Sequence, residues 1–445
     1  MSQQIEDIKE RLAKFPPAHT IYTEMQTPNE EFMIYEGDFS LKEGKNIYKV
    51  TGNIIFKWLP ALGIKVNGRF IDSSPGIDEY YFDVILDGIV LCGIILENFS
   101  IGKEVSFVGS PTTDPIVGDK TISVQNINFI LPNMRKYIGN IIKSETENLS
   151  WVGRLLLEDE KYKIEIDMLP DYNNKFDMLK NEGGYISLHN GHMFCKKGAI
   201  SSDESDDIFM CLSKFLSFVN GRRVSPLHRK GLHEGEIIWT NYSNYLNDIY
   251  KNVVSWIPES KIELNSAWNN FTKLWTDKDN KDFLISVIHW YVEANSNSGF
   301  LEGSIILIQI ALELIYNWYV VEQNKLIVGK DSEDICAANK IRLLMSQVGI
   351  KKDISIMLPL LKNKLLGTNQ SFNDEIDVFV QIRNAIVHSQ KDKRAKLNGF
   401  TTDEKYEAKK FGLWLIELSI LKIVGYKGKY YNRCNDLDEN VPYII

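Results

Sequence analysis

The sequence predicts a multidomain protein with both α and β parts: a β-rich N-terminal region of the sandwich or barrel type, followed by an all-α helical bundle. Residues 31–194 consist of short runs rich in β-branched and aromatic residues, separated by Gly, Pro, Asn or Asp, as in many-stranded folds. From residue 281 onward apolar residues recur at helical spacing. A length of 445 residues allows two or three domains. We therefore expect a β-rich region (1–200), a mixed helical connector (201–280), a helical bundle (281–430) and a C-terminal tail (431–445).

The β-rich region is predicted from its runs of strand-forming residues. Near its end, residues 185–189 and 192–195 flank Asn190-Gly191, which predicts a hairpin on a two-residue turn. The other expected strands are 47–50, 52–58, 80–86, 89–96, 104–108, 121–129, 151–157 and 161–168.

The helices are predicted from a change of period after this hairpin. The first ends at Gly221, and a looser mixed pattern follows over residues 239–256. The expected helices are 207–220, 282–295, 301–323, 335–348 with a shorter turn near 358–365, 374–389 and 404–424.

Composition excludes several classes of protein. The net charge of -8 disfavours a constitutive nucleic-acid coat, which binds phosphates through Lys and Arg. The first 15 residues mix charges where a signal peptide needs an apolar core, so we expect a cytoplasmic protein. The apolar run 305–321 includes Gln309, Glu313 and Asn317, which favours a buried helix over a membrane span. Because no phosphate-binding loop or dinucleotide-binding turn occurs, we expect no cofactor.

The five cysteines form no C-x-x-C pair, so neither a disulfide framework nor a four-cysteine zinc site is indicated. His189, His192 and Cys195 have a spacing that suits zinc as a weak alternative. The predicted hairpin explains the same residues without a metal, and we expect no metal site.

One short motif carries chemistry. In the helix 374–389, a stripe of apolar residues surrounds Arg383. A guanidinium on such a stripe needs a carboxylate or a phosphate to meet it, because it cannot lose its charge. Asn384 and His388 lie one turn apart on the flank of the stripe. Either Arg383 is a structural residue paired with Glu313, or it binds a ligand phosphate. The stripe is formed by Ile376, Phe379, Val380, Ile386 and Val387.

The same R-x-x-x-x-H spacing occurs a second time, from Arg223 to His228. This match contains Pro226 and follows Gly221, so it is predicted to be a loop without an apolar stripe. We interpret it as a coincidence.

The segment Arg383-Asn384-x-x-x-His388 resembles the R-[polar]-x-x-x-H signature of HEPN domains, a family of helical ribonucleases found in toxins and defence proteins. The resemblance covers residues 281–430. A β-rich N-terminal region before such a unit is also similar to ApeA-like anti-phage proteins. The resemblance implies a metal-independent endoribonuclease in which two protomers build one composite cleft, hence a homodimer or higher homo-oligomer.

The resemblance also implies roles for single residues. His388 would be the general acid or base, Arg383 would stabilise the charge of the transition state, and Asn384 would orient a phosphate or the imidazole. Glu313 would hold Arg383 in place. Four basic residues after the motif are expected to bind the RNA backbone, although a solvated loop is the usual explanation of such a cluster. They are Lys391, Lys393, Arg394 and Lys396.

These expectations describe an anti-phage effector of the abortive-infection type. Its substrate would be cellular RNA, with tRNA as a candidate by family analogy, and the N-terminal region would restrain it until a phage-derived trigger acts. The alternative is a non-catalytic HEPN scaffold for dimerisation or binding, with the function in the β-rich domain. The charge distribution suits a restrained nuclease, since residues 281–430 hold 20 Lys and Arg against 17 Asp and Glu while the whole chain is acidic.

Overall fold

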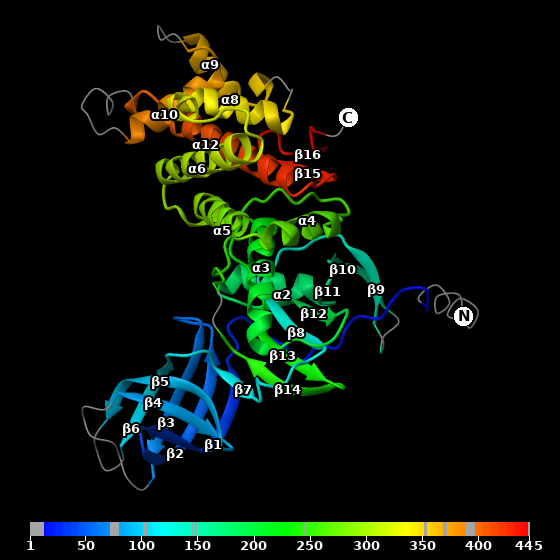
Figure 1. The fold of residues 1–445 in the computed structure, drawn as a ribbon, viewed down its shortest axis with the longest axis vertical. Coiled ribbons are helices and arrows are strands. Elements are labelled where there is room, and N and C mark those ends of the chain that lie inside the picture. The colour runs from blue at the N-terminus through cyan, green and yellow to red at the C-terminus, as the bar shows by residue number, and fades with distance from the viewer. Residues whose placement is uncertain are drawn as a thin grey trace. The chain divides into compact units, whose positions relative to one another are not determined.

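The computed structural model describes residues 13–71, 80–100, 105–144, 146, 149–243, 246–350, 354–367, 372–387 and 397–443. The chain divides into two compact units (Figure 1). The β unit comprises Met1–Lys136, Asn140–Ser213 and Val224–Lys251, and the helical unit comprises Tyr137–Gly139, Lys214–Arg223 and Asn252–Ile445. A β-rich N-terminal region and a helical C-terminal region are thus confirmed.

The first part of the β unit is a closed antiparallel barrel with the strand order β1-β2-β3-β6-β5-β4. Pairing of β1 with β4 closes it, and Leu41 and Val84 lie opposite each other there with no exposed surface. Along each strand of a barrel, alternate residues point inward. The many short strands of this region predicted either a sandwich or a barrel, and its first part is a barrel. The strands are β1 Phe32–Glu43, β2 Asn46–Lys57, β3 Gly63–Phe70, β4 Tyr81–Leu86, β5 Ile89–Ser100 and β6 Ser106–Pro111.

The second part is an eight-stranded sheet with the order β7-β14-β13-β8-β12-β11-β10-β9, in which all named pairs are antiparallel. The helix α2 (Tyr172–Glu182) and the hairpin β13–β14 were not expected from the sequence; the hairpin lies inside the predicted connector. The strands are β7 Ile116–Gly118, β8 Asn126–Pro132, β9 Asn140–Lys143, β10 Ser150–Glu158, β11 Tyr162–Met168, β12 Ser187–Cys195, β13 Leu227–His233 and β14 Glu236–Asn241.

The predicted hairpin at Asn190-Gly191 is wrong, because both residues lie within the continuous strand β12. β12 pairs with β11 on one side and β8 on the other. A side chain at Gly191 would meet ring atoms of Phe129 at 2.2 Å, so glycine is required there by packing across the sheet. The glycine is needed here because the Phe129 ring lies close to the backbone, and not because the chain turns.

The helical unit is built from helices whose ends follow local capping rules. The side chain of Asp277 accepts a hydrogen bond from the Asn280 amide at the start of α5, and Thr401 with Glu404 forms a capping box at the start of α12. The helices are α3 Ser202–Asn220, divided between the two units, and α4 Asn265–Trp275, α5 Lys278–Val292, α6 Leu301–Ile315, α7 Lys330–Asp334, α8 Ala337–Val348, α9 Pro359–Gly367, α10 Glu375–Val387 and α12 Thr402–Ile423.

Two predicted helices continue as π-helix. Residues Glu293–Asn297 extend α5, and Tyr316–Gln323 extend α6. A short 3-10 turn, Ile354–Ile356, precedes α9. The predicted tail includes most of a two-stranded sheet of β15 (Lys429–Asn432) and β16 (Leu437–Asn440).

The segment Leu301–Gln323 packs against α12, α5 and α10. By length and composition it would suit a bilayer, alone among the described helices, yet 56% of its apolar window is buried inside the protein. A buried share of this kind is typical of a core helix, as predicted for residues 305–321.

Candidate functional site

The helix α10 carries the sequence motif, and its N-terminal end is firmly held. Arg342 of α8 donates from Nε to Asp374 at 2.7 Å and from Nη2 to Asp377 at 2.7 Å. These charge-assisted bonds raise the pKa of the Arg342 guanidinium further, against the opposing effect of its partial burial. α10 also packs on α6, α8 and α9. The helix that positions the motif is therefore anchored from several sides.

The predicted apolar stripe of α10 is only partly correct. Phe379 and Ile376 are buried as expected, but Val387 is 44% exposed and Ile386 is only half-buried. The buried face runs instead through Val378, Phe379, Ile382 and Ala385. The 3.6-residue period moves the C-terminal part of the stripe toward solvent. Arg383 consequently lies at the border of the buried face, not at its centre.

At that border Arg383 is half-buried and donates from Nη1 to the side-chain oxygen of Asn384 at 3.1 Å. Within the described part of the chain it forms no ion pair. Glu313 of α6 is half-buried and accepts a hydrogen bond from Gln309 at 3.0 Å. The predicted support of Arg383 by Glu313 is not among these contacts, and it stays a prediction.

His388, the predicted acid or base, lies outside the described residues, as do the predicted RNA-binding residues Lys391, Lys393, Arg394 and Lys396. The structure places Arg383 and Asn384 together on the last turn and a half of α10. In sequence, His388 follows directly after the end of this helix.

The residues of the weak zinc alternative do not come together. His189 and His192 are three positions apart on β12, so they point to opposite faces of the sheet. Cys195 shares the face of His189 but lies about 20 Å further along the strand, at ~3.3 Å per residue. Burial lowers the pKa of each histidine to about 3. Among the described residues, no group of three or more His, Cys, Asp or Glu is arranged to hold a metal.

Sequence reasoning missed a row of polar side chains across the sheet of the β unit, which we call the polar row. Glu165 of β11 is opposite His192 of β12, His192 is opposite Asn128 of β8, and Asn128 is opposite Lys230 of β13. Residues directly opposite one another share a face. The full row is Arg154, Glu165, Asp167, Asn190, His192, Asn128 and Lys230.

One end of the polar row is a closed ion network. Arg154 donates from Nε and Nη2 to the two carboxylate oxygens of Asp167, each at 2.7 Å. Glu165 contacts Lys163 at 2.8 Å and the His19 ring at 2.5 Å. Burial raises the pKa of Glu165, but the bonds from His19 and Lys163 and the charge of Arg154 outweigh it and lower the value to about 2. The signal for this network was the alternation of Glu165 and Asp167 in a predicted strand.

A second network lies in the interior of the helical unit. Glu417 of α12 is fully buried, and it accepts from Tyr291 Oη at 2.5 Å and from Arg433 Nε at 2.9 Å. Arg433 donates from Nη1 to Asn295 at 3.0 Å. No motif pointed to this cluster, because its members come from separate elements.

The fold therefore defines a protein with a barrel, an antiparallel sheet and a helical unit. Residues 119–253 match the family model described as the YopA central domain, and residues 277–442 match that of the YopA C-terminal domain. These matches cover β8 to β14 and α5 to β16, and the barrel lies outside both.

Over 420 residues the chain is 26% identical to the "SPbeta prophage-derived uncharacterized protein YopA" of Bacillus subtilis (strain 168), covering 91% of this chain and 92% of that protein. No solved structure matches the chain.

Proposed function

We propose that this protein is an anti-phage effector of the abortive-infection type, whose helical unit is a metal-independent HEPN endoribonuclease. The observation that carries the proposal is the state of Arg383: a half-buried guanidinium at the end of an anchored helix, bonded to the amide of Asn384 and to no carboxylate among the described residues. Its charge remains available to a phosphate of RNA.

In the proposed reaction the ribose 2′-oxygen attacks the adjacent phosphorus, and the bond from phosphorus to the 5′-oxygen breaks. His388 takes the proton of the 2′-hydroxyl, or gives a proton to the leaving 5′-oxygen. Arg383 stabilises the negative charge on the phosphoryl oxygens, and Asn384 orients the guanidinium or a phosphate. The products are a 2′,3′-cyclic phosphate and a 5′-hydroxyl.

A dimer supplies the geometry that one protomer lacks. Positions 383 and 388 point about 140° apart around a helix, at ~100° per residue. A two-fold partner brings both pairs to one groove. The basic residues Lys391, Lys393, Arg394 and Lys396 would hold the RNA backbone at its rim.

In this proposal the β unit regulates the nuclease. A phage-derived trigger in the cytoplasm releases it, and tRNA is a candidate target. The similarity to a protein named as prophage-derived suits a role in conflicts between phages or between phage and host. An RNase without such restraint would damage the cell that makes it.

The test incubates the full-length protein with total RNA in EDTA, alone and with phage lysate. We expect cleavage that leaves 2′,3′-cyclic phosphate ends, and a loss of at least about 100-fold in Arg383→Ala and His388→Ala. His289→Ala is the matched control, since its side chain is 44% exposed on a different helix; it should cleave normally. Cleavage at the parental rate in His388→Ala would refute the assignment.

The alternative is a non-catalytic scaffold with the function in the β unit. The observation that favours it is the pocket beside the polar row, described below. No cleavage under any trigger, together with a stable dimer, would support the scaffold.

A further inference from the structure

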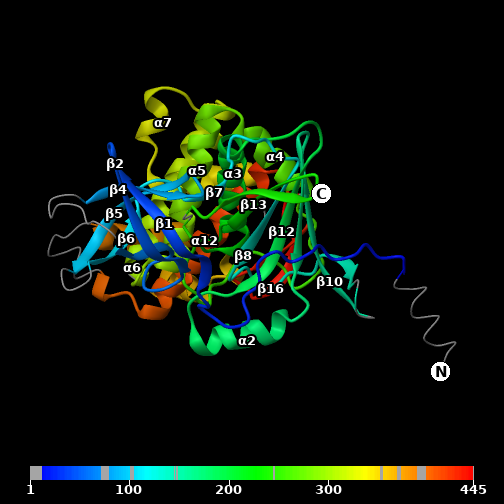
Figure 2. The same cartoon turned by 90° about the horizontal axis from the view of Figure 1, so that it is seen from below.

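The N-terminal residues 16–23, which we call the strap, cross the polar face of the sheet (Figures 1 and 2). At the sheet edge the Ala18 amide donates to the Lys143 carbonyl at 2.8 Å. Further along, the His19 amide donates to Asp167 at 2.9 Å, and Lys230 Nζ donates to the Tyr22 carbonyl at 2.7 Å. Arg154 of β10 donates to the Pro17 carbonyl at 2.9 Å, and the His19 ring stacks on His192 of β12 with ring centroids 4.1 Å apart. The strap thus contacts five strands, β9, β10, β11, β12 and β13.

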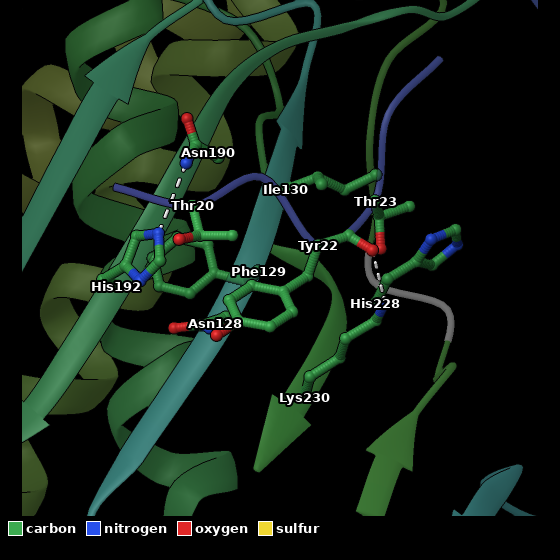
Figure 3. Close-up of a pocket in the computed structure, with 10 residues that line it drawn as sticks. All are labelled: Thr20, Tyr22, Thr23, Asn128, Phe129, Ile130, Asn190, His192, His228 and Lys230. Carbon is green, nitrogen blue, oxygen red and sulfur yellow. Dashed lines mark hydrogen bonds between the residues drawn. The ribbon is translucent and has the colours of Figure 1, made fainter. Parts of the chain in front are cut away.

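Between the strap and the sheet lies a pocket with an empty volume of about 210 Å³, counting the part open to solvent. Its floor is the end of the polar row away from the ion network: Asn128, Asn190, His192 and Lys230 (Figure 3). Its roof is formed by Thr20, Tyr22 and Thr23 of the strap.

Asn128 is the best indication that the pocket accepts a ligand. The residue is only 6% exposed, and its side chain points into the pocket (Figure 3). Among the described residues its side-chain amide has no hydrogen-bond partner, and its polar atoms are not sealed from solvent, so the amide is open to a ligand in the pocket. The nearby Asn190 is 5% exposed, and among the described residues its side-chain amide forms one hydrogen bond, to the His192 ring at 3.3 Å. Two buried amides therefore retain bonding capacity at one place.

The charge of the pocket selects the kind of ligand. Lys230 is half-buried and its bond to Tyr22 is to a neutral carbonyl; it forms no ion pair within the described residues. The carboxylates nearest along the row, Glu165 and Asp167, are already neutralised by Lys163 and Arg154. The pocket consequently holds one cation without a counter-charge, which favours an anion.

We propose that Asn128, Asn190 and Lys230 form a binding site for a small anionic group, a carboxylate or a phosphate, closed by the strap. The ammonium supplies the charge, and the two amides donate hydrogen bonds to the anion's oxygens. Because strap residues form the roof, an occupied site fastens the strap to the sheet. This site is independent of the proposed nuclease.

Calorimetric titration of the full-length protein at constant ionic strength tests the proposal, with inorganic phosphate in one arm and acetate and succinate in the other. We expect saturable binding of one probe, weakened at least tenfold in Lys230→Met and in Asn128→Asp, which places a carboxylate beside the ammonium. Lys120→Met, an exposed lysine of the same unit, should bind like the parent. The arm that binds identifies the anion.

Limited proteolysis provides a second readout, because the chain of a destabilised variant is cleaved rapidly even without a probe, which separates a loss of folding from a loss of binding. The bound probe should slow cleavage of the strap in the parent protein and in Lys120→Met. Absence of saturable binding by the parent, or equal binding by a folded Lys230→Met, would overturn the proposal and leave a water-filled gap under the strap.

Discussion

Arg433 and Arg383 both belong to the helical unit, but their surroundings differ. Arg433 is 5% exposed and is fastened to the fully buried carboxylate of Glu417, to Asn295 and, through that carboxylate, to Tyr291. Arg383 is half-buried and contacts the neighbouring Asn384. A buried arginine with a full set of partners serves the fold. An arginine with spare donors at a helix end has a charge that a ligand can use.

The largest expected effect is that of Arg433→Met. It leaves Glu417 buried with Tyr291 but without its cation, and an uncompensated buried charge costs about 3–5 kcal/mol. Scanning calorimetry should show a much lower transition temperature. The double variant Arg433→Met with Glu417→Leu removes both charges and should recover part of the loss. An unchanged transition in the single variant would contradict a structural role for Arg433.

The second-largest expected effect is that of acid on the ion network at one end of the polar row in the β unit. The folded pKa of Glu165, about 2, lies below its unfolded value of 4.5, so its contribution is present above pH 4.5 and is lost as the pH falls to about 2. The effect is on the order of 3 kcal/mol. Buried His189 and His192, with pKa values of about 3, lower the stability in acid from pH 6.5 downward.

This pH dependence is measured as the thermal midpoint from pH 7 to pH 3. Glu165→Gln should be less stable at pH 7 and should lose less stability below pH 4.5 than the parent. The exposed Glu160→Gln serves as the control and should follow the parent curve. A Glu165→Gln curve parallel to that of the parent would show that the carboxylate is not held by its cations.

The smallest expected effect on stability is that of Arg383→Ala. The side chain is half-buried and has one hydrogen-bond partner among the described residues, Asn384, so we expect a loss of less than about 0.5 kcal/mol. Scanning calorimetry of Arg383→Ala and Arg433→Met under the same conditions compares the two losses of stability directly. A loss as large as that of Arg433→Met would make Arg383 a structural residue and would remove the ground for its proposed role in RNA cleavage.

The fold could be predicted where the local pattern decides the structure. The run of strand-forming residues 89–96 and the capping residues around Thr401 each depend on neighbours in sequence. Gly191 shows where this fails: Asn-Gly usually marks a turn, but here the ring of Phe129 on another strand requires the glycine. The strand β13 was missed for a similar reason, since it starts just after Pro226 and contains His228 with a positive φ of 51°.

The same distinction holds for the two sites. Arg383 and Asn384 could be found from the sequence because both lie on one helix, and only the exact border of the buried face was displaced. Asn128 and Lys230 could not be linked, because their proximity depends on the strand order β8–β13. A pocket formed by strand order and a strap leaves no short motif.

The strap also affects how the chain assembles during synthesis. Its contacts span 148 residues from His19 to Asp167 and 208 residues from Tyr22 to Lys230. A ribosome adding roughly 5–20 residues per second delivers those partners many seconds after the strap itself has emerged. The first described segment of the protein is thus among the last to reach its place, and the polar face of the sheet stays open to solutes until then.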